Sequence, residues 1–199
     1  MNAPLILSLA VMLYAVLHSW LASLGAKAWV RQRLGPSAER WYRLAYNLFA
    51  GVSGLPILAL IALLPDQPLY QIPFPWVLLT SVGQLAGITI IVVGILQTGL
   101  WHFVGLRQVV DPQVEADSPL VTTGLYRRMR HPLYTGGLLL IWLAPLMTVN
   151  LLIVFMWLTV YLVVGAKLEE RRLSQTFGEA YRQYKQRVPM FIPSYRRAK

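Results

Sequence analysis

The chain contains no cysteine and only three histidines among its 199 residues. The absence of cysteine excludes disulfide bonds, thiol catalysis and cysteine-ligated metal. The histidines stand at positions 18, 102 and 131, and no two of them have the spacing of a zinc-ligand pair. We therefore expect no metal site.

Charged residues are scarce as well. Only 13% of the chain is charged, 56% is hydrophobic, and the mean hydropathy is +0.52. This composition is too apolar for a soluble domain of this length and is typical of a small polytopic membrane protein. The sequence therefore predicts one all-α domain embedded in the lipid bilayer, without a separate soluble domain.

Long apolar runs set the predicted architecture. A transmembrane helix needs about 20 mostly apolar residues, and three runs reach that length: Leu5–Gly25, Leu44–Leu64 and Trp76–Leu100. Two shorter runs, Leu138–Met147 and Leu151–Ala166, are separated only by Thr148-Val149-Asn150 and predict a helical hairpin. We expect about five transmembrane helices, arranged as three N-terminal spans (1–106), a cytoplasmic loop (107–130), the hairpin (131–166) and a cytoplasmic tail with short helices (167–199).

Positive charge is missing from one side of the predicted membrane. All 18 Lys and Arg residues fall after the first span, after the third span or in the tail, and the opposite side carries only Asp66. By the positive-inside rule, the N-terminus lies outside and the C-terminus is cytoplasmic. We expect an integral protein of the bacterial inner membrane. This topology explains the net charge of +10, and no nucleic-acid-binding motif accompanies it.

Polar side chains flank the predicted hairpin at both ends. Arg130-His131-Pro132-Leu133-Tyr134-Thr135-Gly136 leads into it, and Glu169-Glu170 follows it. A hairpin returns the chain to the side of the membrane where it began, so both groups are expected at one surface. Histidine, tyrosine and two carboxylates gathered there predict a binding site.

The tail is predicted to form two helices. The first continues from the hairpin through Phe177 and ends at Gly178, a residue suited to a left-handed cap. The second, Glu179–Arg187, carries Tyr181 and Tyr184 on one face and ends before Pro189.

Each of these features also has a simpler structural interpretation. Proline is common at the first position of a helix, tyrosines gather at membrane interfaces, and Gly136-Gly137 suits close helix packing. Glu169 and Glu170 would, as a solvated pair, bind Lys167, Arg171 or Arg172. The order of the features and their common side of the membrane favour a site.

The residues from Gly124 to Pro193 resemble a known superfamily. The matching elements are Arg-His-Pro-x-Tyr-x-Gly, the apolar hairpin, Glu-Glu, Phe-Gly-x-x-Tyr-x-x-Tyr and Val-Pro-x-x-Ile-Pro. This order resembles the integral membrane methyltransferases of the isoprenylcysteine carboxyl methyltransferase and phospholipid methyltransferase superfamily. The resemblance implies S-adenosylmethionine as cofactor and methyl donor, and it implies these cofactor contacts: Arg130, His131, Pro132, Tyr134, Gly136, Glu169 and Glu170.

The N-terminal part resembles a narrower branch, the methanethiol S-methyltransferases. The matching residues are His18-Ser19, Glu39-Arg40, Gly105-Leu106-Arg107-Gln108-Val109 and Pro145-Leu146-Met147-Thr148. The resemblance implies a small or lipophilic methyl acceptor, first of all a thiol, with an isoprenylcysteine carboxylate or a phospholipid amine as alternatives. No feature of the sequence indicates an obligate protein partner.

Methyl transfer is an in-line displacement, so positioning supplies most of the catalysis. Carboxylates at Glu169 and Glu170 suit the cationic amino group or the ribose hydroxyls of the donor. A thiol acceptor would first lose its proton, and His102 and His18 are the candidate catalytic bases, because buried polar residues near spans are functional candidates. Hydrogen bonding between helices is the structural alternative for His18.

Two other classes of function stay open. A sterol-type reductase has a related C-terminal architecture but binds NADPH, and it usually carries Arg-Asp-Glu where this chain has Leu168-Glu169-Glu170. A non-catalytic membrane scaffold would keep the fold without the reaction, although the intact set of site residues argues against it.

Overall fold

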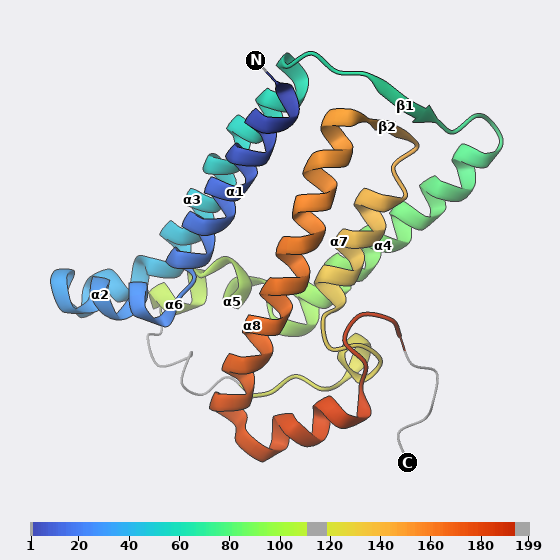
Figure 1. The fold of residues 1–199 in the computed structure, drawn as a ribbon. Coiled ribbons are helices and arrows are strands. Elements are labelled where there is room, and N and C mark those ends of the chain that lie inside the picture. The colour runs from blue at the N-terminus through green and yellow to red at the C-terminus, as the bar shows by residue number, and fades with distance from the viewer. Residues whose placement is uncertain (1, 111–118, 194–199) are drawn as a thin grey trace. The chain divides into compact units, whose positions relative to one another are not determined.

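The computed structural model describes residues 2–110 and 119–193, and these are mostly helical, as predicted (Figure 1). Part of the predicted loop 107–130 lies outside the described residues, as do Arg196, Arg197 and Lys199. The elements are α1 (Ala3–Leu21), α2 (Leu24–Leu34), α3 (Pro36–Leu63), β1 (Pro68–Gln71), α4 (Trp76–Thr98), α5 (Leu100–Val104), α6 (Leu106–Val110), η2 (Gly124–Arg127), α7 (Pro132–Trp142), β2 (Leu146–Thr148) and α8 (Val149–Arg187).

Four helices among the described residues are long and apolar enough to cross a membrane. They are α1, the Arg40–Leu63 part of α3, α4 and α8. These four correspond to four of the five predicted spans. Among the described helices of 10–17 residues, α7 is apolar but has only 11 residues.

The predicted span Leu138–Met147 is not one helix in the structure. The helix begins earlier, at Pro132, and ends at Trp142, while Leu146 and Met147 belong to β2. Pro145 gives the physical reason, because proline disfavours helical conformation in the residue before it and lacks an N–H for a helical hydrogen bond. The chain then pairs β2 with β1 in a two-stranded sheet that the apolar pattern did not predict.

The chain forms two compact units that alternate along the sequence. Unit 1 comprises Met1–Gln67, Gly99–Ser118 and Thr148–Leu158, and unit 2 comprises Pro68–Thr98, Pro119–Met147 and Thr159–Lys199. Helix α8 therefore begins in unit 1 and continues in unit 2.

Unit 1 is built around the packing of α1, α3 and the start of α8. Leu7, Val11 and Val154 form its buried apolar cluster, against which Ile57 and Trp157 pack. The Tyr14 hydroxyl donates to the Ala50 carbonyl at 3.2 Å, and the Tyr42 hydroxyl donates to the Leu21 carbonyl at 2.5 Å. These bonds join helices through neutral groups.

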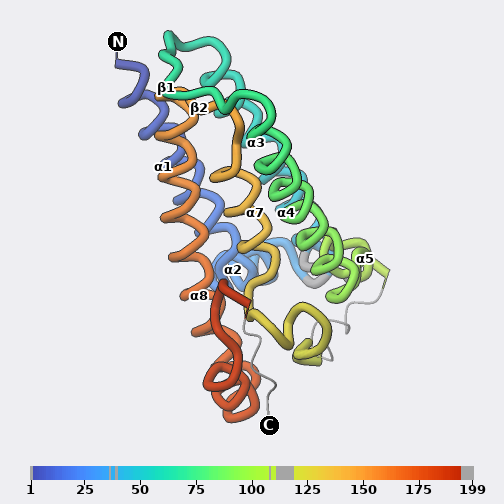
Figure 2. Tube along the Cα trace, turned by 90° about the vertical axis from the view of Figure 1, so that its right-hand side faces the viewer, coloured from blue at the N-terminus to red at the C-terminus, as the bar shows by residue number. Residues whose placement is uncertain are grey.

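Unit 2 is built around α4 and α7, which lie side by side in Figures 1 and 2. A row of small residues on α4 allows this approach. A side chain at Gly87 would come within 2.8 Å of the Gly136 carbonyl oxygen, and one at Gly94 would reach Leu133. Gln84 Nε2 also donates to the Leu140 carbonyl at 2.9 Å.

Helix α8 continues beyond its apolar part and changes direction at Gly178, as predicted. Gly178 has φ 55° and ψ −125°, which are not helical values. The change of direction turns the segment from Glu179 onward back toward α7, as Figure 1 shows within unit 2.

Candidate functional site

The Arg-His-Pro segment is fixed between η2 and α7 in unit 2. Gly124 opens η2 with φ 60°, and a side chain at that position would collide with Gln97 at the end of α4. The backbone N–H of Leu125 donates to Gln97 Oε1 at 3.0 Å. These contacts explain why a glycine begins the turn, and they place Arg130 and His131 immediately before the first residue of α7, Pro132.

The C-terminal tail binds this segment through its backbone carbonyls. We call Val188–Phe191 the strap. The N–H of Arg130 donates to the Pro189 carbonyl at 2.9 Å, and the N–H of His131 donates to the Met190 carbonyl at 3.1 Å. Thr135 Oγ1 donates to the Phe191 carbonyl at 2.9 Å. The predicted Val-Pro-x-x-Ile-Pro element is therefore part of the site's frame.

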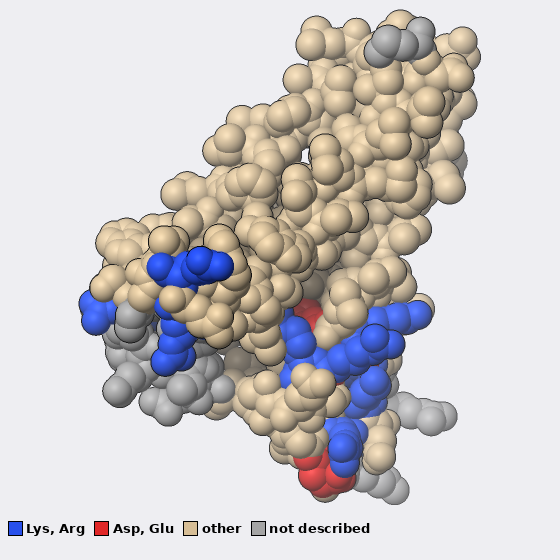
Figure 3. Space-filling view, turned by 60° about the vertical axis from the view of Figure 1, so that its left-hand side comes forward, with Lys and Arg blue, Asp and Glu red and all other residues tan. Residues whose placement is uncertain are grey.

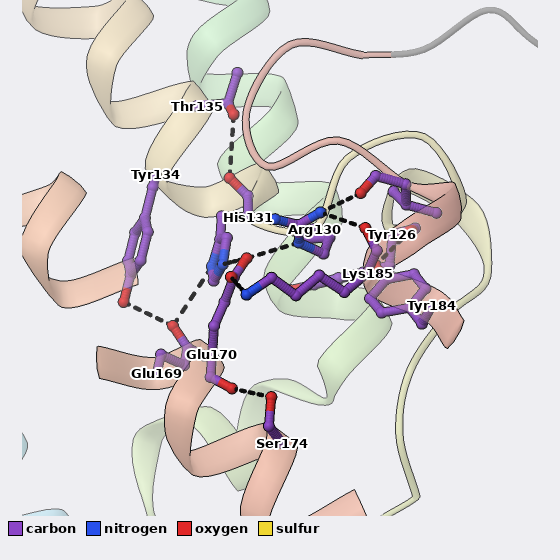
Figure 4. Close-up of polar contacts among 11 residues, drawn as sticks. Tyr126, Arg130, His131, Tyr134, Thr135, Glu169, Glu170, Ser174, Tyr184 and Lys185 are labelled. Carbon is purple, nitrogen blue, oxygen red and sulfur yellow. Dashed lines mark hydrogen bonds and ion pairs between the residues drawn. The ribbon is translucent and has the colours of Figure 1, made fainter. Parts of the chain in front are cut away.

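Glu170 lies at the centre of a buried ionic cluster (Figure 4). Arg130 Nε donates to Glu170 Oε1 at 2.6 Å, and Lys185 Nζ lies 2.8 Å from Oε2. His131 Nε2 lies 3.3 Å from Oε1. The Glu170 side chain is 3% exposed, so it retains its charge by having cationic partners on both oxygens.

The guanidinium of Arg130 is also bound to the tail. Besides Glu170, it donates through Nη1 to the Lys185 carbonyl at 3.0 Å and to the Val188 carbonyl. This set of acceptors matches the fixed fork of donors on arginine. Arg130 therefore joins α8, the strap and the start of α7.

Glu169 has a different environment from its neighbour. Its side chain is 47% exposed. Glu169 Oε2 accepts from the Tyr134 hydroxyl at 2.9 Å and lies 3.6 Å from His131 Nδ1 (Figure 4). The His131 and Tyr134 rings are parallel, with an interplanar angle of 1° and centroids 5.3 Å apart. Glu169 thus has a half-exposed side chain whose carboxylate lies beside two stacked rings.

Both glutamates lie beyond Ala166, the last residue of the apolar run, and both remain ionised. Burial acts to raise the pKa of Glu170, but the hydrogen bonds from Lys185 and Arg130 outweigh it and hold that pKa below its ordinary value. Burial likewise opposes ionisation of Glu169, yet His131, Tyr134 and the charge of Arg172 lower its pKa on balance. Figure 3 shows acidic atoms bordered by Lys and Arg atoms.

Tyrosines surround the cluster as neutral groups. Burial and the charge of Glu169 raise the pKa of Tyr126 to about 12. The Tyr184 hydroxyl donates to the Tyr126 carbonyl at 2.6 Å, which ties the last part of α8 to η2. Tyr181 is 1% exposed, and its ring centroid lies 5.8 Å from that of Tyr184, so the predicted pair does share one face.

The structure therefore brings together five predicted site residues in unit 2: Arg130, His131, Tyr134, Glu169 and Glu170. Pro132 is fully buried and packs near Gly94. Gly136 is buried against Gly87 and Ile91 of α4, where a side chain would come within 2.6 Å of the Gly87 carbonyl oxygen. In this structure Pro132 and Gly136 both pack α7 against α4.

The two candidate bases lie in unit 1, each with a separate partner. The Tyr46 hydroxyl lies 2.7 Å from His18 Nε2. Arg43 Nη1 lies 3.2 Å from His102 Nε2. His18 therefore joins α1 to α3, the structural alternative that the sequence left open, and its role as a base stays a prediction.

Sequence reasoning did not predict Lys185 as a partner of the glutamates. It named Lys167, Arg171 and Arg172, which are close in sequence. The charge of Arg172 does act on Glu169, but Glu170 is bound by Arg130 and Lys185. Helical spacing carried a usable signal, because Lys185 follows Tyr181 by four positions and so shares its face of the second tail helix.

Comparison with known proteins agrees with the geometry. Residues 82–180 match the phospholipid methyltransferase family. The chain is 36% identical to methanethiol S-methyltransferase 1 of Bradyrhizobium diazoefficiens, over 96% of this chain and 67% of that protein. It is 32% identical to the methanethiol S-methyltransferase of Pseudomonas deceptionensis, over 95% of this chain and 72% of that protein.

A third similar protein is the methanethiol S-methyltransferase of Mycobacterium tuberculosis, which is 29% identical over 90% of this chain and 74% of its own length. No solved structure gives a significant match. The similarity to the first two proteins extends over nearly the whole chain and is not confined to the site. The chain therefore belongs to the phospholipid methyltransferase family of integral membrane methyltransferases, in the branch of proteins similar to methanethiol S-methyltransferases.

Proposed function

We propose that this chain transfers a methyl group from S-adenosylmethionine to a small thiol, and that the donor binds at the Tyr134–Glu169 face of unit 2. The observation that carries the proposal is the half-exposed side chain of Glu169, whose ionised carboxylate is held by Tyr134 beside the His131 ring. The names of the similar proteins support a thiol as acceptor.

The residues present fit this donor. Its amino group is cationic and its ribose carries hydroxyls, and both are suited to a carboxylate that accepts charge-assisted hydrogen bonds. Glu169 is 47% exposed and ionised, so it can accept such bonds, while the 3%-exposed Glu170 is already bound to Arg130 and Lys185. We assign the direct contact to Glu169 and Tyr134, and a positioning role to Glu170, Arg130 and His131.

The donor supplies an electrophilic methyl group on a sulfonium sulfur. The chain's contribution is to hold the reactants in line, which can supply most of the rate enhancement of such a displacement. Tyr126 keeps its proton at neutral pH because its pKa is about 12, so it does not act as a base.

Isothermal titration of the purified protein tests donor binding. We expect S-adenosylmethionine and its demethylated product to bind, and NADPH not to bind. Transfer of a labelled methyl group is then measured with short thiols, a farnesylated cysteine and phosphatidylethanolamine. Binding of NADPH alone would indicate a reductase, and binding without transfer to any acceptor would indicate a scaffold.

The proposal also places the site on the cytoplasmic side, with the N-terminus outside. The 18 Lys and Arg residues support this orientation through the positive-inside rule. The cysteine-free chain allows a direct test with Glu179→Cys on the exposed end of α8 and Gln67→Cys next to β1. An impermeant thiol reagent added to intact cells should label only the second variant, and labelling of the first alone would reverse the topology.

A further inference from the structure

Glu170 in unit 2 has more cationic partners than its charge requires. Arg130 Nε lies 2.6 Å from Glu170 Oε1, and Lys185 Nζ lies 2.8 Å from Oε2. The contacts of Glu169 are with Tyr134 and His131 instead. Since Arg130 alone would neutralise Glu170, the charge of Lys185 remains for a further anion.

The two cations differ in how far a ligand could reach them. The Arg130 side chain is 8% exposed, and its Nε and Nη1 atoms donate to Glu170 and to the Lys185 and Val188 carbonyls. The Lys185 side chain is 48% exposed. An ammonium has three donors, and within residues 2–110 and 119–193 the Lys185 ammonium binds only Glu170. Lys185 can therefore bind a second anionic group without releasing the first.

Lys185 projects from a backbone that is fixed on both sides. It lies on the part of α8 beyond the change of direction at Gly178. Its own carbonyl accepts from Arg130 Nη1 at 3.0 Å, and the hydroxyl of the preceding residue, Tyr184, donates to the Tyr126 carbonyl at 2.6 Å. Figure 4 shows the Lys185 side chain extending from this segment to Glu170. The position of its ammonium is therefore defined by the same contacts that hold the tail.

The charges of the site are arranged around the His131 ring. On one side, Glu169 Oε2 lies 3.6 Å from His131 Nδ1; on the other, Glu170 Oε1 lies 3.3 Å from Nε2, and Lys185 is bound to Glu170. A half-exposed carboxylate and a half-exposed ammonium are thus separated by one imidazole and one carboxylate, all within unit 2. This arrangement suits a ligand that carries a positive and a negative group close together.

The α-amino acid end of S-adenosylmethionine is such a group. Its carboxyl group is ionised and its amino group is protonated at neutral pH. We propose that Lys185 binds the donor carboxylate while Glu169 binds the donor amino group, so that the site selects donors with an intact α-amino acid end. The inference rests on the proposed function and specifies which residue recognises which charge of the donor.

A simpler role for Lys185 makes a different prediction. If Lys185 only supports Glu170, its substitution disturbs the whole site and weakens all ligands by the same factor. A direct charge-assisted bond to the donor carboxylate affects only ligands that have this carboxylate. A series of ligands that differ by single groups therefore separates the two roles.

Isothermal titration of the detergent-solubilised full chain with three ligands provides the test. They are S-adenosylmethionine, its decarboxylated form, and 5′-methylthioadenosine, which lacks the entire amino acid end. We expect wild type to bind the donor about 10- to 160-fold more tightly than its decarboxylated form, the range for a hydrogen bond to a charged group. This comparison needs no substitution, so it does not depend on whether a variant folds.

Lys185→Gln should remove most of the preference for the carboxylate, and Lys185→Arg, which keeps the charge, should retain part of it. The matched control is Arg182→Gln on the same helix, because Arg182 is 67% exposed and is paired with Glu179. This control removes the same charge from the tail and should keep the full preference.

Glu169→Gln gives the complementary result. It should weaken the donor and the decarboxylated donor by similar factors, since both carry the amino group, and leave 5′-methylthioadenosine unchanged. Equal weakening of all three ligands would place Glu169 at the ribose and overturn the assignment of the amino group.

The outcomes distinguish this inference from the proposed function. If wild type binds the donor and its decarboxylated form equally, or if Lys185→Gln weakens all three ligands by one factor, the role of Lys185 is overturned while the methyltransferase proposal stands. If wild type binds none of the three ligands, the proposed function fails, and the assignment of Lys185 fails with it.

Discussion

In unit 2 a buried carboxylate, Glu170, is bound by Arg130 and Lys185, whereas in unit 1 the helices α1 and α3 are joined by neutral groups such as Tyr46 and His18. The ionic cluster lies beyond Ala166, where the apolar run of α8 has ended. The contacts between α1 and α3 lie within helices apolar enough to cross a membrane. The location of each kind of contact follows from the cost of burying charge in an apolar medium.

The comparison also separates structural from functional polar groups. A buried ion pair that loses one member leaves the other charge without compensation, while a neutral hydrogen bond between helices contributes little net stability. Unit 2 should therefore be sensitive to removal of buried charge. Unit 1 should tolerate loss of a single hydroxyl.

The largest effect is expected for Glu170→Ala. The substitution leaves Arg130 buried and unpaired on that side, so the free energy of unfolding should fall by about 3–5 kcal/mol. Tyr46→Phe in unit 1 removes one hydroxyl and should cost only about 0.5–1.5 kcal/mol. Thermal unfolding in the same detergent compares the two, and equal losses would remove the distinction between the units.

Glu169→Gln should affect donor binding without affecting stability. Its carboxylate is 47% exposed, so loss of the charge is tolerated by the fold. Loss of a hydrogen bond to a cationic group weakens binding by about 1.5–3 kcal/mol, or about 10- to 160-fold in Kd. Isothermal titration with S-adenosylmethionine measures the change, with Glu179→Gln in an exposed ion pair as the control. Unchanged affinity would mean that Glu169 is a solvated surface residue that does not contact the donor.

Two adjacent glycines offer a sharper comparison inside unit 2. A side chain at Gly136 would lie 2.6 Å from the Gly87 carbonyl oxygen, whereas one at Gly137 would meet only Leu162, at 3.8 Å. Gly136→Ala should therefore destabilise the packing of α4 and α7 by about 1–3 kcal/mol. Gly137→Ala should be neutral or slightly stabilising, since alanine favours the helix. Equal unfolding temperatures for the two variants would contradict the close packing.

The sequence predicted the elements whose signals are local. Apolar length identified four helices that can span a membrane, and Gly178 marked the change of direction in α8. From the order of motifs, Arg130 and His131 were expected near Glu169 and Glu170. In the structure these residues are in contact, because the helices between them return the chain to the same region of unit 2.

The sequence did not predict contacts that depend on distant partners. The pairing of β1 with β2 needs two segments separated by more than 70 positions, and neither has an alternating pattern. The different exposures of Glu169 and Glu170 arise from where Arg130 and Lys185 meet them, which adjacent identical residues cannot reveal. Glu169 and Glu170 are adjacent, so they lie on different faces of α8, and tertiary packing decides which of the two faces is buried.

The smallest effect is expected at Asp66, the only charged residue on the side of the membrane predicted to lie outside. Asp66 Oδ1 accepts from the backbone N–H of Asn150 at 3.0 Å and so caps the start of α8 from another segment. Although burial opposes it, hydrogen bonds from Thr148 and from the N–H groups of Asn150, Gln67 and Val149 lower the pKa of Asp66. A lowered pKa means that ionised Asp66 stabilises the folded state above its unfolded pKa of about 3.9 and loses this effect as the pH falls through the folded value.

Asp66→Ala should reduce the free energy of unfolding by about 0.5–1 kcal/mol at neutral pH. The difference from wild type should shrink below about pH 4. Unfolding in detergent from pH 7 down to pH 3 measures it, and a difference that stays constant over this range would show that the carboxylate charge does not contribute to the cap.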